Sequence, residues 1–162
     1  MRRRARPVLL AAALAIVPLQ SAAAACADEA VTDAARLHEF GTLMMDVSLR
    51  CGLMGITMQP HYEAMVSTHQ AMFDGATARL KHFFATTAAS EDRHGGLYDR
   101  YATLIANRYG GGNTSLESCR MFDAVAYEIG QAGDGGKVLN AVARAMITHP
   151  VLESAACPGA KP

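Results

Sequence analysis

The sequence contains no tryptophan, and tyrosine and phenylalanine contribute only five residues each to a chain of 162. No apolar run reaches the ~20 residues that a helix needs to cross a bilayer. The run from Val8 to Leu19 has about 12 residues and contains Pro18. Strand-like alternation of apolar and polar residues and internal repeats are also missing. These absences argue against a sheet-based core, whereas the many alanines favour closely packed helices.

Sequence motifs of common catalytic sites are missing as well. The chain has no Gly-x-Ser-x-Gly, His-Glu-x-x-His or Cys-x-x-Cys. Its Gly110–Gly112 run lacks the Lys-Ser/Thr ending of a phosphate-binding loop. The sequence therefore predicts a protein without catalytic activity. An enzyme remains an alternative that a pocket with convergent polar groups would support.

Residues 1–25 have the three-part pattern of a secretory signal peptide. Four arginines lie within the first six residues, an apolar segment follows, and four alanines precede Cys26. This order of basic, apolar and small residues is typical of export signals. We expect cleavage after Ala25, with Ala23 and Ala25 as the small residues read by the peptidase. The exported protein is then a single domain, 26–162, in the periplasm.

A lipoprotein is the alternative, because Cys26 would be the first residue after cleavage. Lipoprotein signals usually carry a large aliphatic residue three positions before that cysteine, whereas this chain has Ala23 there. Lipidation would also leave one of the four cysteines unpaired.

Cleavage changes the charge of the protein. Residues 1–25 hold four of the 15 basic residues and none of the 15 acidic ones, so the remainder has 11 basic residues and a formal charge of −4. A mildly acidic chain without a basic cluster is a poor nucleic-acid binder. We expect no nucleic-acid partner and no transmembrane segment in the mature form, and a protein partner in the envelope is an open alternative.

Apolar residues recur at helical spacing in five runs, four of them ended by glycine or proline and the second followed by a polar loop. The predicted helices cover 28–52, 60–84, 97–109, 115–129 and 135–149. Short connections between them predict an all-α antiparallel bundle of about five helices, followed by an extended tail to residue 162.

The first predicted helix is central, with Leu37, Met44 and Cys51 on its core face. Gly75 could mark a bend in the second helix. Thr114 with Glu117 predicts a capping box, and Asp134 is the expected cap of the last helix. The expected inward face of that last helix is Val138, Val142, Ala145, Met146 and His149.

Cys26, Cys51, Cys119 and Cys157 form an even set, which in an exported protein indicates disulfides. The first helix, at 1.5 Å per residue, is ~39 Å long, so Cys26 and Cys51 lie too far apart to bond. In an up-down bundle the end of this helix lies near the start of the fourth. We therefore predict Cys51–Cys119 and Cys26–Cys157; free buried thiols are the alternative.

A copper site on the second predicted helix is the main competing hypothesis. His61, Met65, His69 and Met72 fall within an arc of about 80° at 100° per residue. Imidazole and thioether groups suit copper, and thioethers suit Cu(I) in particular. The same arc overlaps the expected inward face of Tyr62, Phe73 and Leu80, and methionine commonly fills gaps in cores. Core packing without a cofactor is therefore the preferred interpretation.

Two segments, ARLHEFGTLMMDVSLRC (residues 35–51) and YDRYATLIANRYG (residues 98–110), resemble a group of small exported four-cysteine proteins of alphaproteobacteria. Some of that group circulate under the name S-adenosyl-L-homocysteine hydrolase. That enzyme needs a much longer chain and a Gly-rich strand-turn-helix unit for its nicotinamide cofactor, and neither is present here. The resemblance implies export and the four-cysteine layout, and it implies no activity.

Together these patterns predict a periplasmic, disulfide-linked helical protein that serves as a binding or envelope-structural module.

Overall fold

The computed structural model describes residues 26–87 and 96–158. Six α-helices and a short 3-10 helix are present in these residues, without any β-strand. They are α1 (Glu29–Leu53), α2 (Gln59–Thr68), α3 (Gln70–Thr87), α4 (Gly96–Gly110), α5 (Leu116–Gln131), α6 (Lys137–Met146) and η1 (Val151–Ala155). The all-α prediction is confirmed, and the predicted signal peptide, 1–25, lies outside the described residues.

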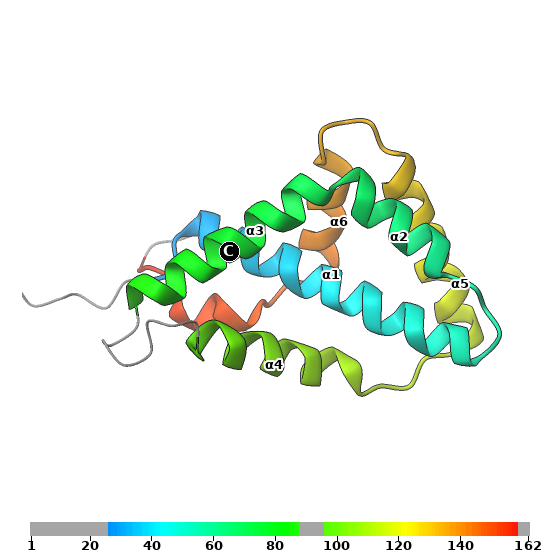
Figure 1. Cartoon of the computed structure of the whole chain (residues 1–162), viewed down its shortest axis with the longest axis horizontal. Coiled ribbons are helices and arrows are strands. Elements are labelled where there is room, and N and C mark those ends of the chain that lie inside the picture. The colour runs from blue at the N-terminus through cyan, green and yellow to red at the C-terminus, as the bar shows by residue number, and fades with distance from the viewer. Residues whose placement is uncertain (1–25, 88–95, 159–162) are drawn as a thin grey trace, which may run out of the picture.

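Helix α1 runs through the middle of the molecule and contacts every other helix. Figure 1 shows α3 along one side of it, α4 along the other, and α2 and α5 beside its C-terminal half. Its sequence suits this position, because small residues such as Ala34 and Ala35 allow close approach while Phe40 and Met44 fill the space between helices. Leu37, Met44 and Cys51 are buried, as predicted.

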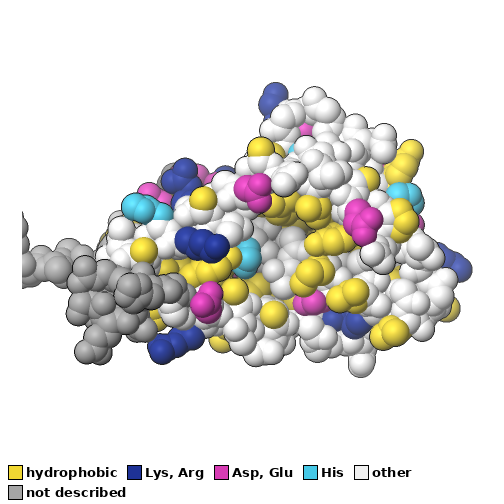
Figure 2. Space-filling model, viewed as in Figure 1, with side chains coloured by type: hydrophobic (Ala, Val, Ile, Leu, Met, Phe, Trp, Pro, Cys, Tyr) yellow, Lys and Arg dark blue, Asp and Glu magenta, His cyan; other side chains and the backbone are white. Residues whose placement is uncertain are grey.

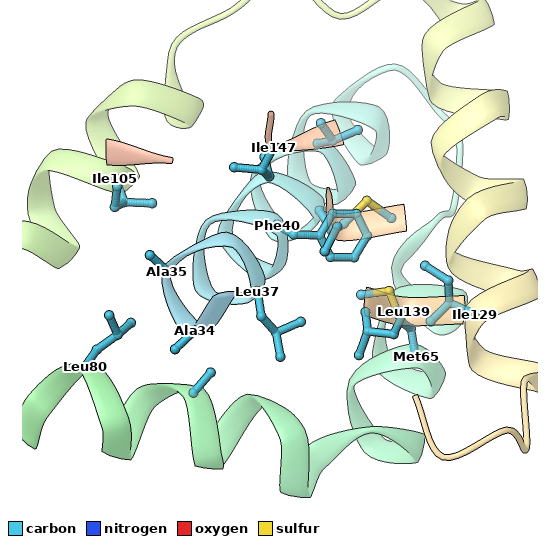
Figure 3. Close-up of a cluster of buried hydrophobic side chains, with 14 of the residues drawn as sticks. Ala34, Ala35, Leu37, Phe40, Met65, Leu80, Ile105, Ile129, Leu139 and Ile147 are labelled. Atoms are coloured by element: carbon cyan, nitrogen blue, oxygen red, sulfur yellow. The ribbon is translucent and has the colours of Figure 1, made fainter. Parts of the chain in front are cut away.

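The core is assembled around α1 from all the surrounding helices. Figure 3 shows Leu80 of α3, Ile105 of α4, Ile129 of α5 and Leu139 of α6 gathered around it. All four side chains are fully buried. None of the helices in the described part of the chain combines the length and hydrophobicity that a membrane span requires.

The two predicted disulfides are present and pin both ends of α1. Cys26–Cys157 joins the residues before α1 to the end of the chain, with the two Cα atoms 4.8 Å apart. Cys51–Cys119 joins the last turn of α1 to the first turn of α5, with Cα atoms 5.6 Å apart. Disulfides of this kind are typical of proteins that fold in an oxidising compartment.

The second predicted helix, 60–84, is in fact two helices that meet at His69. The imidazole Nε2 of His69 lies 2.9 Å from the carbonyl oxygen of Ile129, and the hydroxyl of Thr68 donates to the carbonyl oxygen of Gly130. Both contacts are made at the C-terminal end of α5, so the helix breaks where it meets α5. A bend at Gly75 was the wrong position, since Gly75 lies inside α3.

Two local predictions at helix ends need correction, and a third holds in part. Ser115 rather than Thr114 caps α5, because its hydroxyl accepts from the backbone N–H of Ser118. The tail after α6 is not fully extended, since it forms η1. The N-cap residue of α6 is Gly136, and Asp134, two residues earlier, caps the helix from there by accepting from the backbone N–H groups of Gly136, Lys137 and Val138.

The predicted inward face of the last helix was correct only for Val142 and Met146, which are half-buried and pack against the core. The helix ends at Met146, before Pro150, and its buried residues are Leu139 and Ala143. Val138 is 38% exposed, and Ala145 and His149 are exposed as well. The buried face is therefore shifted by one residue, because Leu139 rather than Val138 points towards α1.

Candidate functional site

An open hollow lies between α1 and the α2–α3 pair. It has a volume of about 190 Å³. The residues that line it are His38, Gly41, Thr42, Met45, Tyr62, Val66, Phe73 and Thr77. Gly41 lets Phe73 lie close to α1, because a Cβ atom at this position would be only 3.1 Å from the phenyl ring. We call this the first hollow.

A second hollow of about 230 Å³ follows along the same helix. It is lined by Ser48, Leu49, Gly52, Ile56, Thr57, Met58 and Gln59. At 100° per residue, the α1 residues of both hollows fall on the same side of the helix. The two hollows are therefore consecutive, one beside the middle of α1 and the other beside its C-terminal end.

Large apolar side chains lie exposed along this side of α1. Met45 is 40% exposed and Leu49 is 63% exposed. Figure 2 shows hydrophobic side chains gathered in a hollowed surface between the upper helices, α2 and α3, and α4. We define the α1 groove as the two hollows together with Met45 and Leu49.

His38 lies at the N-terminal end of the α1 groove. Its ring stacks on Tyr101 of α4, with 5.8 Å between the ring centroids. Burial lowers the pKa of the His38 imidazole below its usual value. The ring is therefore neutral at pH 7 and adds no charge to the groove.

Two carboxylates, Asp46 and Glu63, act on Tyr62 of the first hollow without lining either hollow themselves. Burial raises the pKa of Asp46, and the charge of Arg50 opposes this effect. The Oδ2 atom of Asp46 is buried without a hydrogen-bond partner. Burial also raises the pKa of Tyr62, and the charges of Asp46 and Glu63 raise it further. Tyr62 of the first hollow thus lies within the field of both carboxylates.

Arg50, whose charge acts on Asp46, makes its hydrogen bonds to other groups. Its guanidinium donates to the carbonyl oxygens of Tyr109 and Gly110 and to the hydroxyl of Thr114. These contacts satisfy carbonyl groups at the C-terminal end of α4. The unpaired Asp46 oxygen remains without a hydrogen-bond donor.

A buried carboxylate on α1 fixes two neighbouring elements. Glu39 is fully buried. One of its oxygens accepts from the hydroxyl of Tyr109 at 2.8 Å and the other from the backbone N–H of Val151 at 2.6 Å. Glu39 therefore ties α4 and the start of η1 to the central helix, and it has a structural role.

The four residues of the copper hypothesis occupy separate surroundings. His61 lies 2.6 Å from Asp123 through its Nδ1 atom, Met65 is fully buried in the core, and His69 uses Nε2 on the Ile129 carbonyl. Met72 packs against Gly136, where a Cβ atom would overlap its sulfur. Within residues 26–87 and 96–158, no group of three or more His, Cys, Asp or Glu side chains is placed to hold a metal ion. Copper binding stays a prediction without structural support.

The groove itself was not predicted from the sequence. Tyr62 and Phe73 were assigned to the inward face of a single helix, and they do pack half-buried against the core, but together with Val66 they also line the first hollow. One sequence feature could have predicted the groove. Met45, Leu49 and Leu53 recur every four residues of α1 and form an apolar stripe outside the predicted core face of that helix.

The fold and the α1 groove together define a disulfide-linked α-helical protein with an open, largely apolar groove beside its central helix. No protein-family model, curated protein or solved structure matches the chain. The groove is therefore the feature of the molecule that bears on its function.

Proposed function

We propose that the protein is an exported, non-catalytic binding module of the periplasm, and that the α1 groove receives apolar groups of its ligand or partner. The observation that carries this proposal is the pair of hollows joined by Met45 and Leu49. Large apolar side chains that are gathered in a concave surface mark binding sites more often than isolated ones do. The disulfides at both ends of α1 hold the floor of this groove in place.

The export half of the proposal is supported by the two disulfides and by the signal-like sequence of residues 1–25. Cell fractionation of a bacterial host that produces the full chain tests it. We expect the protein in the periplasmic fraction, with Cys26 as its first residue. A cytoplasmic protein that retains residues 1–25 would contradict export.

The absence of catalysis is supported by where the acid–base pairs lie. Within the described residues, His61–Asp123 and His149–Glu153 are in contact, and neither pair lines the groove. His38 lines the first hollow and stacks on an aromatic ring instead. The hollows thus carry one neutral imidazole and several hydroxyl groups, and neither of these His–carboxylate pairs is beside them to activate a hydroxyl.

The size of the first hollow suggests a probe for binding. Dry apolar cavities of ~150 Å³ accept benzene, so a hollow of about 190 Å³ accommodates a single ring. We expect indole, added to ¹⁵N-labelled protein from the periplasm, to shift the amide resonances of residues that line the first hollow.

Thr42→Trp, which fills the first hollow, tests whether the indole sits there. The control is Ala124→Trp, which adds the same side chain at an exposed position of α5 that lines neither hollow. We expect Thr42→Trp to abolish the shifts and Ala124→Trp to preserve them. Shifts that are scattered over the surface, or that persist in Thr42→Trp, would contradict the proposed function.

A further inference from the structure

The two disulfides differ in how far solvent reaches them. Cys51 and Cys119 are both fully buried in the core. Cys26 is exposed, and Cys157 is half-buried. Thiol–disulfide exchange begins when a thiolate attacks one sulfur of the bridge, so access to that sulfur limits its rate. A reductant in solution therefore reaches Cys26–Cys157 in the folded protein, whereas it reaches Cys51–Cys119 only after the core opens.

The outer bridge, Cys26–Cys157, fastens a short C-terminal segment to the start of α1. We define this segment, residues 150–158, as the strap; it comprises η1 and the residues on either side of it. Figure 1 shows the strap in red beside the N-terminal half of α1. Pro150 and Leu152 are its only buried residues, so little apolar area holds it in place. A chain end with so few buried contacts opens readily unless it is tied down.

Backbone hydrogen bonds also hold the strap. The N–H of Ala27 donates to the carbonyl oxygen of Ala155 at 2.8 Å, and the N–H of Cys157 donates to the carbonyl oxygen of Ala27 at 2.9 Å. Further along, the N–H of Val151 donates to the buried carboxylate of Glu39. The first two bonds lie next to the disulfide, so they lose their alignment when the two sulfurs separate. Opening of the strap then admits water to the carboxylate that Val151 covers.

Reduction of the outer bridge by a dithiol balances in atoms and electrons. One thiolate of the reductant bonds to the sulfur of Cys26, the bond to Cys157 breaks, and Cys157 leaves as a thiolate that takes up a proton. The second thiolate of the reductant attacks the mixed disulfide, and Cys26 leaves in the same way. The bridge is reduced to two thiols, and the dithiol is oxidised to its own disulfide.

We propose that Cys26–Cys157 is a redox latch, which a dithiol reductant opens in the folded protein to release the strap from α1 while Cys51–Cys119 stays oxidised. The oxidised form is closed, with the strap over Glu39. The reduced form exposes this part of α1 and keeps the rest of the core. The latch does not depend on what the α1 groove binds.

The first measurement identifies which bridge is reduced. Protein isolated from the periplasm is treated with dithiothreitol under native conditions, its free thiols are alkylated, and mass spectrometry of the digest locates them. We expect Cys26 and Cys157 to be alkylated at least about tenfold faster than Cys51 and Cys119, because the buried pair waits for the core to open. Equal rates, or faster modification of the buried pair, would overturn the proposal.

The second measurement shows whether the strap opens. Hydrogen exchange is followed at the amides of Ala27, Val151 and Cys157, which form the bonds described above, and at the amide of Ile129 inside α5. After selective reduction we expect the first three to exchange roughly tenfold faster or more, while Ile129 keeps its protection. Reoxidation should restore slow exchange. Unchanged exchange at the strap would contradict the latch, because the bridge would then not be what holds the strap closed.

The variant Cys26→Ala/Cys157→Ala provides the open form without a reductant. We expect it to show fast exchange at the strap and normal protection in α5. Dithiothreitol should cause no further acceleration in this variant, because the bridge on which it acts is missing. Acceleration by dithiothreitol would show that another bridge controls the strap. Loss of protection in α5 would show that the strap cannot open alone. Either result would overturn the proposal.

Discussion

At the scale of single residues, Glu39 is the most consequential polar group. Its carboxylate is fully buried beside α4 and η1. Burial raises its pKa, while hydrogen bonds from Val151 and Tyr109 and the charge of Arg108 partly oppose the rise. The folded state therefore binds a proton more readily than the unfolded chain does. The stability gained from this proton is complete below the unfolded pKa near 4.5 and is lost as the pH rises through the folded value.

Glu39→Gln tests this pH dependence, because it keeps the shape and removes the charge. We expect wild type and variant to be similar in free energy of unfolding at pH 4. The variant should become more stable than wild type as the pH rises to 7. Urea unfolding at both pH values measures the difference. A gap that stays constant or reverses with pH contradicts the assignment.

Glu39→Leu makes the complementary test of hydrogen bonding. The hydroxyl of Tyr109 and the backbone N–H of Val151 lose their acceptor in this variant. We expect a loss of about 1–3 kcal/mol in the free energy of unfolding at pH 7, the usual cost of a buried group left unpaired. An unchanged stability would show that Glu39 does not tie η1 and α4 to α1.

The histidines and methionines of α2 and α3 give a residue-scale prediction about copper. Met65 is fully buried and one ring nitrogen of His69 is already used. We expect titration of the purified protein with Cu(I) to show no binding tighter than micromolar. Tighter binding that is lost in His61→Asn/His69→Asn would restore the copper hypothesis.

At the scale of elements, the sequence was informative about local signals and uninformative about contacts between helices. Asp28 caps α1 and Asp134 caps α6 through their own neighbours, and such signals are legible in the sequence. The break at His69 could not be predicted from the sequence, because it depends on carbonyl groups of α5 some 60 residues away. The first hollow exists only because α2 and α3 change direction there, so it was missed with the break.

Two glycine substitutions test how closely α2 and α5 pack. At Gly130 a Cβ atom would lie 3.2 Å from the backbone nitrogen of Met65, whereas at Gly75 it would meet nothing within 4 Å. We expect Gly130→Ala to lower the free energy of unfolding by roughly 1–3 kcal/mol, because backbone must move. Gly75→Ala should raise it by up to about 1 kcal/mol, since alanine favours the helix. Equal effects in thermal or urea unfolding would contradict the close approach.

At the scale of the whole molecule, the fold class and the cysteine pairing were both predictable from the sequence. They follow from the length of α1 and from the up-down order of the helices, which place Cys51 near Cys119. The groove was not predictable, because it requires the relative positions of three helices. It is a property of packing rather than of any one segment.

The two disulfides should affect the groove differently. Cys51 directly precedes Gly52, which lines the second hollow, whereas Cys26–Cys157 lies at the far end of α1. We expect either double alanine variant to lose about 2–5 kcal/mol of stability. Cys51→Ala/Cys119→Ala should also shift the amide resonances of residues that line the second hollow, and Cys26→Ala/Cys157→Ala should leave them unchanged where both variants remain folded. The reverse order would contradict the placement of the groove.

The central claim is that export into an oxidising compartment lets two bridges pin α1 at both ends. Mass spectrometry of the protein from the periplasm, intact and after non-reducing digestion, tests this claim most directly. We predict a chain that begins at Cys26, lacks four thiol hydrogens, and yields only the linked peptides Cys26–Cys157 and Cys51–Cys119. A chain that keeps residues 1–25, or four cysteines that react with a thiol reagent without prior reduction, would contradict the account.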